Sequence, residues 1–152
     1  MNETGEKTIS VKIQLLKKNA VLPEKQSAGA AGFDITACLD GPLTIPPLER
    51  AAVSTGLALE IPPGCEGQIR PRSGLAKNAG LTVLNAPGTI DSDYRGEIII
   101  IVINLGKESV TIKNGDRIAQ IVFCPVLNAV MSAADNLSIT ERGGKGFGST
   151  GL

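Results

Sequence analysis

The chain has 152 residues, with 15 basic and 15 acidic side chains and no histidine. This length allows one domain with a substantial core, and a net charge of zero does not provide the basic face that stable nucleic-acid binding needs. Without histidine there can be no Ser-His triad and no histidine metal site. Proton transfer near neutral pH is therefore expected to depend on a carboxylate.

The three cysteines, Cys38, Cys65 and Cys124, are widely separated and form no C-x-x-C pair. They predict buried free thiols rather than a zinc ribbon or a disulfide framework. The first residues, M-N-E-T-G-E-K, lack the apolar core of a signal peptide, and the longest apolar runs are too short to cross a bilayer. These features predict a cytoplasmic protein that does not associate with membranes.

Short apolar segments separated by turn residues follow one another along the chain. The 18 glycines and 9 prolines are spread between these segments, which indicates many turns rather than disorder. Strands are expected at residues 9–16, 33–35, just before Pro46, 53–61, 68–70, 81–84, 98–103, 109–112 and 117–126. The pattern predicts an all-β fold, a jelly-roll-like barrel or sandwich, with residues 1–152 as a single domain.

One short helix is expected from Ser73 to Gly80, with Ser73 as the N-cap and Gly80 as the stop. It follows the segment R-P-R-S-G (residues 70–74), whose guanidinium groups, hydroxyl and backbone N–H groups suit an anion such as phosphate. The alternative is an ordinary capped helix with surface arginines.

The segment L-N-A-P-G-T-I-D-S-D-Y-R-G-E-I (residues 84–98) is polar and rich in turn residues. It holds Asp91, Asp93 and the only tyrosine, Tyr94. Its flanking strands predict a β-hairpin that presents these groups on a rigid scaffold, and the alternative is a solvated turn. The following strand (residues 98–103) is apolar at every position, so both of its faces require burial, either inside the sandwich or at a subunit interface.

The segment R-G-G-K-G-F-G-S-T-G (residues 142–151) combines glycines with two cations, two hydroxyl groups and Phe147. A glycine-rich tail is usually a disordered linker, but these side chains suit a flexible lid that closes over a nucleotide. The G-x-G-x-x-G pattern inside the segment follows no strand and precedes no helix, so it does not predict a dinucleotide fold.

Polar groups beside two apolar strands complete the set of candidates. These are Asp34 in A-G-F-D-I and the pair Asp116 and Gln120 in G-D-R-I-A-Q, although each alone could be a turn or strand-end residue. Together, the arginines, the helix start and the tail would hold a polyphosphate, aromatic rings would contact base and sugar, and an aspartate would activate water. Mg²⁺ would arrive with the phosphates rather than in a protein cage. The combination predicts a nucleotide polyphosphate hydrolase.

Five segments resemble, in the same order, the five motifs of the trimeric dUTP diphosphatases (dUTPases): A-G-F-D, P-R-S-G-L-A, N-A-P-G-T-I-D-S-D-Y-R-G-E, G-D-R-I-A-Q and R-G-G-K-G-F-G-S-T-G. The resemblance implies a jelly-roll-like fold and a homotrimer with active sites at the subunit interfaces. It implies Mg²⁺-dependent hydrolysis of dUTP to dUMP and pyrophosphate by water that attacks the α-phosphorus, which would limit uracil in DNA and supply dUMP for dTMP synthesis. It also makes residues 98–103 an interface strand and residues 142–152 a mobile lid.

The resemblance further implies a role for individual residues. Asp91 would orient and deprotonate the water as general base, and Tyr94 would pack against the deoxyribose and exclude a ribose 2′-OH. Gln120 would hold the phosphate or water network, and Asp34 would touch the Mg²⁺ shell through water. The other implied substrate contacts are Asn85 and the backbone of Thr89, Ile90 and Ile99 for uracil, Phe147 for stacking on it, Arg72, Ser73 and Gly74 for phosphates, and Arg142, Gly148, Ser149 and Thr150 in the tail.

Two other functions stay open from the sequence. A dCTP deaminase of the same fold would aim its carboxylate base at C4 of the base instead of at the α-phosphorus. A non-catalytic β-sandwich interaction module would keep the fold without nucleotide-induced stabilisation. The aromatic, glycine-rich tail and the I-D-S-D-Y segment favour the hydrolase.

Overall fold

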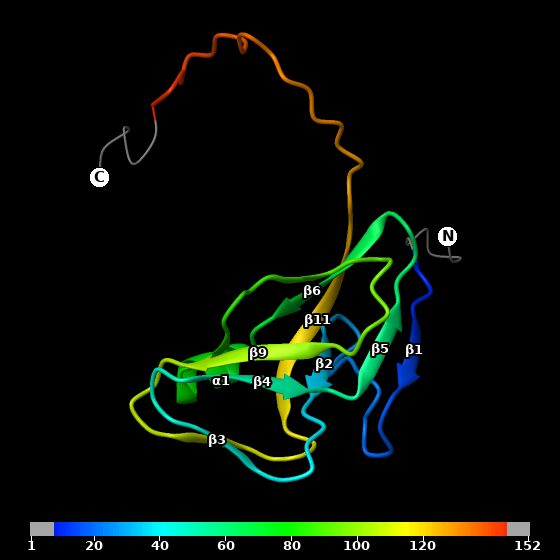
Figure 1. Ribbon diagram of the computed structural model, residues 1–152, viewed down its shortest axis with the longest axis vertical. Helices are drawn as coiled ribbons and strands as arrows, with labels where there is room; N and C mark the ends of the chain where they lie inside the picture. Colours follow the sequence, from blue (N-terminus) through cyan, green and yellow to red (C-terminus); the bar gives the residue numbers. More distant parts are fainter. Residues whose placement is uncertain (1–7, 146–152) are drawn as a thin grey trace.

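The computed structural model describes residues 8–145, and this part of the chain is built almost entirely of β-strands (Figure 1). The strands are β1 (Lys12–Leu15), β2 (Phe33–Thr36), β3 (Leu43–Ile45), β4 (Arg50–Ser54), β5 (Leu57–Glu60), β6 (Cys65–Arg70), β7 (Leu81–Val83), β8 (Gly88–Ile90), β9 (Ile99–Asn104), β10 (Val110–Ile112) and β11 (Arg117–Pro125). A single short helix, α1 (Ser73–Ala79), lies between β6 and β7 in this range. The predicted all-β class is confirmed.

The strands pair across long sequence distances, as in a jelly roll. One sheet has the order β2-β11-β6-β8 and another the order β4-β9-β7, while β1 pairs with β5 and β3 with β10. Every pairing is antiparallel. In Figure 1, β4 and β9 run across the strands of the β11 layer. This arrangement places the core between the two larger sheets.

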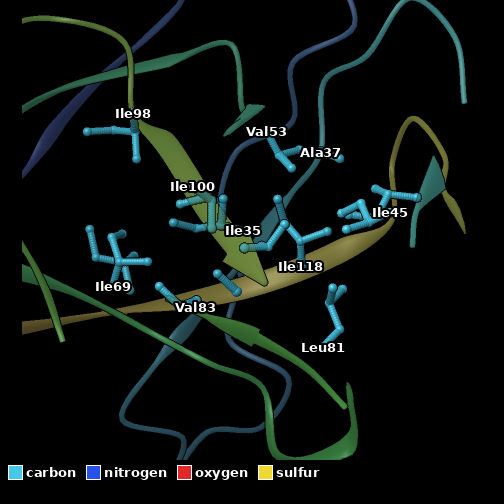
Figure 2. Close-up of a cluster of buried hydrophobic side chains, with 14 of the residues drawn as sticks. Ile35, Ala37, Ile45, Val53, Ile69, Leu81, Val83, Ile98, Ile100 and Ile118 are labelled. Carbon is cyan, nitrogen blue, oxygen red and sulfur yellow. The ribbon is translucent and has the colours of Figure 1, made fainter. Parts of the chain in front are cut away.

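The core consists of side chains that alternate inward along facing strands. Ile35 and Ile69 come from the four-stranded sheet, and Val53, Ile100 and Val83 come from the three-stranded sheet. Figure 2 shows these side chains pointing into one cluster. Burying an aliphatic side chain of this size contributes about 1.5–3 kcal/mol, so a shift of register on either sheet would expose the cluster.

A buried asparagine ties the end of β9 to its surroundings. Asn104 is fully buried. Its Nδ2 donates to the carbonyls of Ile45 (2.9 Å) and Glu108 (2.8 Å), and its Oδ1 accepts from the Gly106 N–H (2.9 Å). The side chain therefore provides hydrogen-bond partners for backbone groups at three positions.

Two expectations about local structure are wrong. The segment 53–61 forms two strands, β4 and β5, because Gly56 takes a left-handed conformation (φ 67°) and turns the chain from the sheet of β9 toward β1. The N-cap of α1 is Arg72 rather than Ser73, and it makes no side-chain cap hydrogen bond. The predicted stop is confirmed, since Gly80 ends the helix with φ 68°.

The segment around Asp91 is not a β-hairpin, which corrects the sequence-based expectation. The strand before it, β8, pairs with β6, whereas the strand after it, β9, pairs with β4 and β7. The chain thus crosses from one sheet to the other through residues 91–97, which we call the Asp91 loop. Local turn signals could not reveal this crossing because a hairpin and a sheet-to-sheet connection share the same turn residues.

The apolar strand β9 occupies the centre of its sheet, but only one of its faces is buried within the chain. Ile100 and Val102 point into the core, while Ile99 and Ile101 are 42% and 38% exposed on the outer face. After β11, residues 126–145 run away from the body without regular structure (Figure 1). We call this segment the arm.

Two smaller points concern the cysteines and membranes. All three cysteines are free thiols, but only Cys38 is buried, and Cys65 and Cys124 are partly exposed. Among residues 8–145, no helix combines the length and the apolarity that crossing a membrane would take.

Candidate active site

The first group of candidate residues gathers where β2, β11 and β6 meet. Antiparallel register places Gln120 on β11 between Asp34 on β2 and Arg70 on β6. Arg72 Nε donates to Asp34 Oδ1 (3.1 Å) and Arg117 Nη1 donates to Asp34 Oδ2 (3.2 Å). We call Asp34, Arg72, Arg117 and Gln120 the arginine cluster. Its two cations outnumber its single carboxylate, so it suits an additional anion.

The arginine cluster is held in place before any ligand arrives. The Asp34 side chain is only 13% exposed, and Arg72 Nη1 also donates to the Arg117 carbonyl (3.1 Å). Gln120 Nε2 donates to the Pro71 carbonyl (2.9 Å), directly before Arg72. Ser73 and Gly74 follow as exposed residues at the start of α1. Sequence segments 32–34, 70–74 and 116–120 are therefore brought together, as expected.

Gly32 sets how closely these segments approach. A Cβ on Gly32 would lie 2.3 Å from Gln120 Oε1, closer than any ordinary contact. Only glycine lets the chain before β2 pass beside Gln120 in its present orientation. By contrast, Asp116 is a turn residue, since its Oδ2 accepts from the Lys113 N–H (2.7 Å).

The second group lies on and around the Asp91 loop. Asp91 and Tyr94 are exposed, Thr89 is exposed, and Ile90 is partly buried. Hydrogen bonds inside the loop stabilise it, because Arg95 Nη1 donates to the carbonyls of Ser92 (2.7 Å) and Tyr94 (2.9 Å). Its carboxylate at Asp91 is thus presented to solvent from a braced turn.

Asn85 and Ile99 flank this loop. Asn85 folds over the buried Gly88, where an added Cβ would lie 3.2 Å from Asn85 Nδ2. The peptide bond between Ala86 and Pro87 is cis. Ile99 is the first residue of β9, directly after the loop, and its side chain faces outward. The residues expected to contact uracil, from Asn85 to Ile99, therefore lie on or directly beside the Asp91 loop.

The two groups lie apart within one chain. In the pairing of β6 with β8, Ile90 is opposite Gly67 and Gly88 is opposite Ile69. Asp91 therefore leaves the sheet at the Gly67 end of β6, whereas Arg72 follows the Arg70 end. Three residues of strand separate Gly67 from Arg70 by about 10 Å. Within residues 8–145, no salt bridge joins Asp91 to the arginine cluster.

The dUTPase family model matches residues 18–151. The chain belongs to the dUTPase family. This confirms the resemblance drawn from the five motifs. Among curated relatives, the deoxyuridine 5′-triphosphate nucleotidohydrolase of Wolinella succinogenes is 60% identical over 143 residues, covering 93% of this chain and 95% of the relative. The protein of the same name from Bdellovibrio bacteriovorus is 57% identical over 144 residues, covering 94% and 97%.

Solved dUTPase structures share the fold. The Staphylococcus bacteriophage 80alpha dUTPase with dUPNHPP superposes with a TM-score of 0.83 at 30% identity, covering 95% of this chain and 100% of that chain. A mutant of the same phage protein with dUpNHpp gives a TM-score of 0.86 at 29% identity, with the same coverage. The jelly-roll architecture is thereby established for this dUTPase-family chain.

The arginine cluster is compatible with Mg²⁺ only through water. Both oxygens of Asp34 already accept from guanidinium groups, and within residues 8–145 no three Asp, Glu or Cys side chains are grouped to hold a metal ion. A direct protein cage does not fit. Each carboxylate oxygen keeps a further lone pair, so an Asp34 contact to a metal-bound water does fit.

Some expected residues lie elsewhere. Arg142 is in the arm, where its Nε donates to the Lys145 carbonyl (3.0 Å), and it approaches neither group within this chain. Phe147, Gly148, Ser149 and Thr150 lie outside the described residues.

Sequence reasoning also missed two residues. Arg117 completes the arginine cluster, and Glu97 anchors the end of the Asp91 loop. The segments G-D-R-I-A-Q and Y-R-G-E contained them, but only the tertiary structure gives them partners, on β2 for Arg117 and in the β4–β5 turn for Glu97.

Proposed function

We propose that this chain is a dUTP diphosphatase that hydrolyses dUTP to dUMP and pyrophosphate, as a homotrimer whose active sites lie between subunits. One observation supports the proposal: the Asp91 loop and the arginine cluster hold complementary halves of the chemistry, but Asp91 follows β8 beside Gly67 of β6, whereas Arg72 follows the Arg70 end of β6. A site that needs both halves can be completed by a neighbouring subunit. Family membership supports the choice of substrate.

The proposed reaction begins with a water molecule beside Asp91. As the water oxygen bonds to the α-phosphorus, the Asp91 carboxylate accepts its proton. The bond between the α-phosphorus and the oxygen bridging to the β-phosphate breaks, and pyrophosphate leaves with that electron pair. Asp91 suits this role because its carboxylate is exposed at the tip of a braced loop.

The arginine cluster would bind the phosphates and stabilise charge on the reacting group. Arg72 is oriented in advance by Asp34 and by the Arg117 carbonyl, so little reorganisation is needed when the substrate binds. Ser73 and Gly74 lie next to Arg72 and are open, since a Cβ on Gly74 would meet nothing within 4 Å. Gln120 would hold a phosphate oxygen or a water.

Mg²⁺ is proposed as the cofactor, carried by the triphosphate rather than by the protein. When bound, it would neutralise phosphate charge. Asp34 would contact its water shell; this is supported by the hydrogen bonds from Arg72 and Arg117, which fix the carboxylate without using all of its lone pairs.

Selection of the deoxyuridine would come from the region around the Asp91 loop. Asn85 and the backbone of Thr89, Ile90 and Ile99 would read the uracil. Tyr94 would pack against the deoxyribose and leave no space for a 2′-OH. In the tail, Phe147 would stack on the base, and Arg142, Gly148, Ser149 and Thr150 would close over the substrate as residues 142–152 form the lid.

Self-assembly is supported by exposed apolar surface. The arm carries apolar side chains that are almost fully exposed: Leu127, Val130, Met131, Leu137 and Ile139. The body carries an apolar groove of about 860 Å³, lined by side chains that include Ile9, Phe33 and Phe123. Together with the outer face of β9, these are apolar surfaces of the kind that mark protein–protein contacts. Burying them against other copies of the chain would stabilise the trimer.

This activity would limit uracil in DNA and supply dUMP for dTMP synthesis. A cytoplasmic location stays a prediction from the sequence, as does the absence of stable nucleic-acid binding.

Pyrophosphate release from each common dNTP, with Mg²⁺ present, tests the function. Rapid release from dUTP alone is the expected result. Formation of a uridine nucleotide from dCTP would instead identify a deaminase. A folded protein that is not stabilised by any nucleotide would identify an interaction module. Light scattering tests the trimer in the same preparation, and a monomer would contradict the shared site.

A further inference from the structure

Glu97, at the end of the Asp91 loop, is bound to the turn between β4 and β5. Its Oε1 accepts from the Gly56 N–H (2.8 Å) and from the Ser54 hydroxyl. Ser54 Oγ in turn accepts from Lys17 Nζ (2.8 Å). The carboxylate is therefore anchored by two donors on a different part of the chain.

The next residue is anchored to the same turn. The Ile98 N–H donates to the Leu57 carbonyl (2.8 Å), and the buried Thr55 hydroxyl donates to the Ile98 carbonyl (2.6 Å). Glu97 is thus held through its side chain and through its following peptide. Its own carbonyl has little freedom to move relative to β4 and β5.

That carbonyl is the acceptor for the Tyr94 hydroxyl, at 3.0 Å. The Tyr94 ring also packs on Gly96, where a Cβ would lie 2.6 Å from the ring carbon Cζ. Tyr94 is 45% exposed, so few packing contacts restrain its ring, and these two contacts help to set its orientation.

We infer that Glu97 is a positioning residue for Tyr94: by fixing its own backbone to the β4–β5 turn, it sets the orientation of the ring that excludes ribose. The inference rests on the proposed function for the role of Tyr94 in sugar selection. The position of the ring, however, can be measured without any substrate.

We call the two hydrogen bonds that Glu97 accepts, from Ser54 and Gly56, the clamp. The direction of the Glu97 pKa shift predicts how the clamp depends on pH. The Ser54 hydroxyl holds the pKa of Glu97 below its ordinary value, burial opposes this, and the Gly56 N–H and the facing Lys17 ammonium add to the lowering. Because the pKa is lowered in the folded protein, the clamp is fully formed above the ordinary pKa of a glutamate. It is lost as the pH falls through the lowered folded pKa.

The chain provides its own probe, since Tyr94 is its only tyrosine and it contains no tryptophan. Near-UV circular dichroism in the tyrosine band therefore reports the order of this ring. Glu97→Ala should weaken the band and lower the ratio of kcat/KM for dUTP over UTP about tenfold, the value of a hydrogen bond to a charged group. Ser54→Ala should also weaken the band and should lower the same kcat/KM ratio about threefold, since it removes one of the two donors.

Glu97→Gln separates charge from shape. Gln keeps an Oε1 acceptor for both donors, so its tyrosine band and its dUTP preference should stay close to the wild type at neutral pH. The wild-type band should decline on the acid side, and Glu97→Gln should not show that decline. Glu108→Gln, which changes an exposed glutamate in the β9–β10 connection, is the matched control and should change nothing.

The outcomes separate the two proposals. A wild-type protein that does not hydrolyse dUTP would refute the proposed function, while the tyrosine band would still test the clamp. An unchanged band in Glu97→Ala and Ser54→Ala would overturn the inference. An unchanged dUTP preference despite a lost band would overturn it as well. If Glu97→Ala does not fold, Ser54→Ala and Glu97→Gln decide the question by the same readouts.

Discussion

Gly32→Ala is expected to reduce activity by displacing one side chain of the arginine cluster. The new Cβ would lie 2.3 Å from Gln120 Oε1 and 3.2 Å from its Cδ. Because an ordinary contact is about 3.4 Å or longer, the oxygen must move by roughly 1 Å. That movement breaks the Gln120 hydrogen bond to the Pro71 carbonyl, which measures 2.9 Å, and withdraws the amide from the place proposed for the substrate.

The expected loss in kcat/KM for dUTP is about tenfold, since one or two hydrogen bonds of about 1 kcal/mol each are lost. Stability should change little. Gly32 does not occupy the left-handed region, so alanine adds no backbone strain. Alanine also restricts the unfolded chain, and this stabilises the folded protein by about 0.4–1 kcal/mol. That gain offsets the lost hydrogen bond to Pro71. Steady-state kinetics and thermal unfolding, measured together, separate the two effects.

Gly29→Ala is the matched control. It lies in the same loop, and an added Cβ would meet nothing within 4 Å, so kinetics should be unchanged. A double-mutant cycle with Gln120→Ala then tests the pathway of the effect. If Gly32→Ala acts through Gln120, the double variant should be no slower than Gln120→Ala alone. Additive losses, or wild-type kcat/KM in Gly32→Ala, would refute the reasoning.

Three further predictions address the base, the lid and the fold. Asp91→Asn should abolish turnover while dUTP still binds, because the amide cannot accept the proton of the attacking water; unchanged kcat, measured by pyrophosphate release, would remove Asp91 from the role of base. Deleting residues 143–152 should leave the circular dichroism and oligomeric state intact but cripple catalysis, and normal activity would dismiss the lid. Asn104→Ala should destabilise the protein by about 3–5 kcal/mol, since three backbone groups lose their partner at about 1–3 kcal/mol each with partial relaxation. Chemical denaturation measures this, and a loss below about 1 kcal/mol would indicate that water replaces the side chain.

Local sequence signals were sufficient to predict an element where the residue types in it favour one conformation. Gly80 predicted the end of α1 because a left-handed residue without a Cβ ends a helix. Alternating apolar residues predicted the strands that build the core. The single strand predicted over 53–61 was wrong because alternation continues through the turn, where Gly56 takes a positive φ and the chain changes sheet.

Pairing between distant strands could not be read in the same way. Arg117 and Arg72 are far apart in sequence, and only the registers of β11 with β2 and with β6 bring both to Asp34. Likewise, Glu97 reads as one more polar residue after a turn until the β4–β5 connection supplies its donors. Long-range hydrogen bonds of this kind leave no periodic trace in the sequence.

The sequence by itself determined the family, the all-β class and the chemical types available: carboxylates for proton transfer, guanidinium groups for phosphate, and no histidine. These follow from composition and ordered motifs, which do not depend on how the strands pair. Only the tertiary structure decided that residues 91–97 cross between sheets, and that Asp91 follows β8 beside Gly67 whereas Arg72 follows the Arg70 end of β6. The physical reason is that antiparallel register, set by burial of the core, assigns each motif to one end of a strand. Our proposal therefore takes the complementary half of the site from a neighbouring subunit.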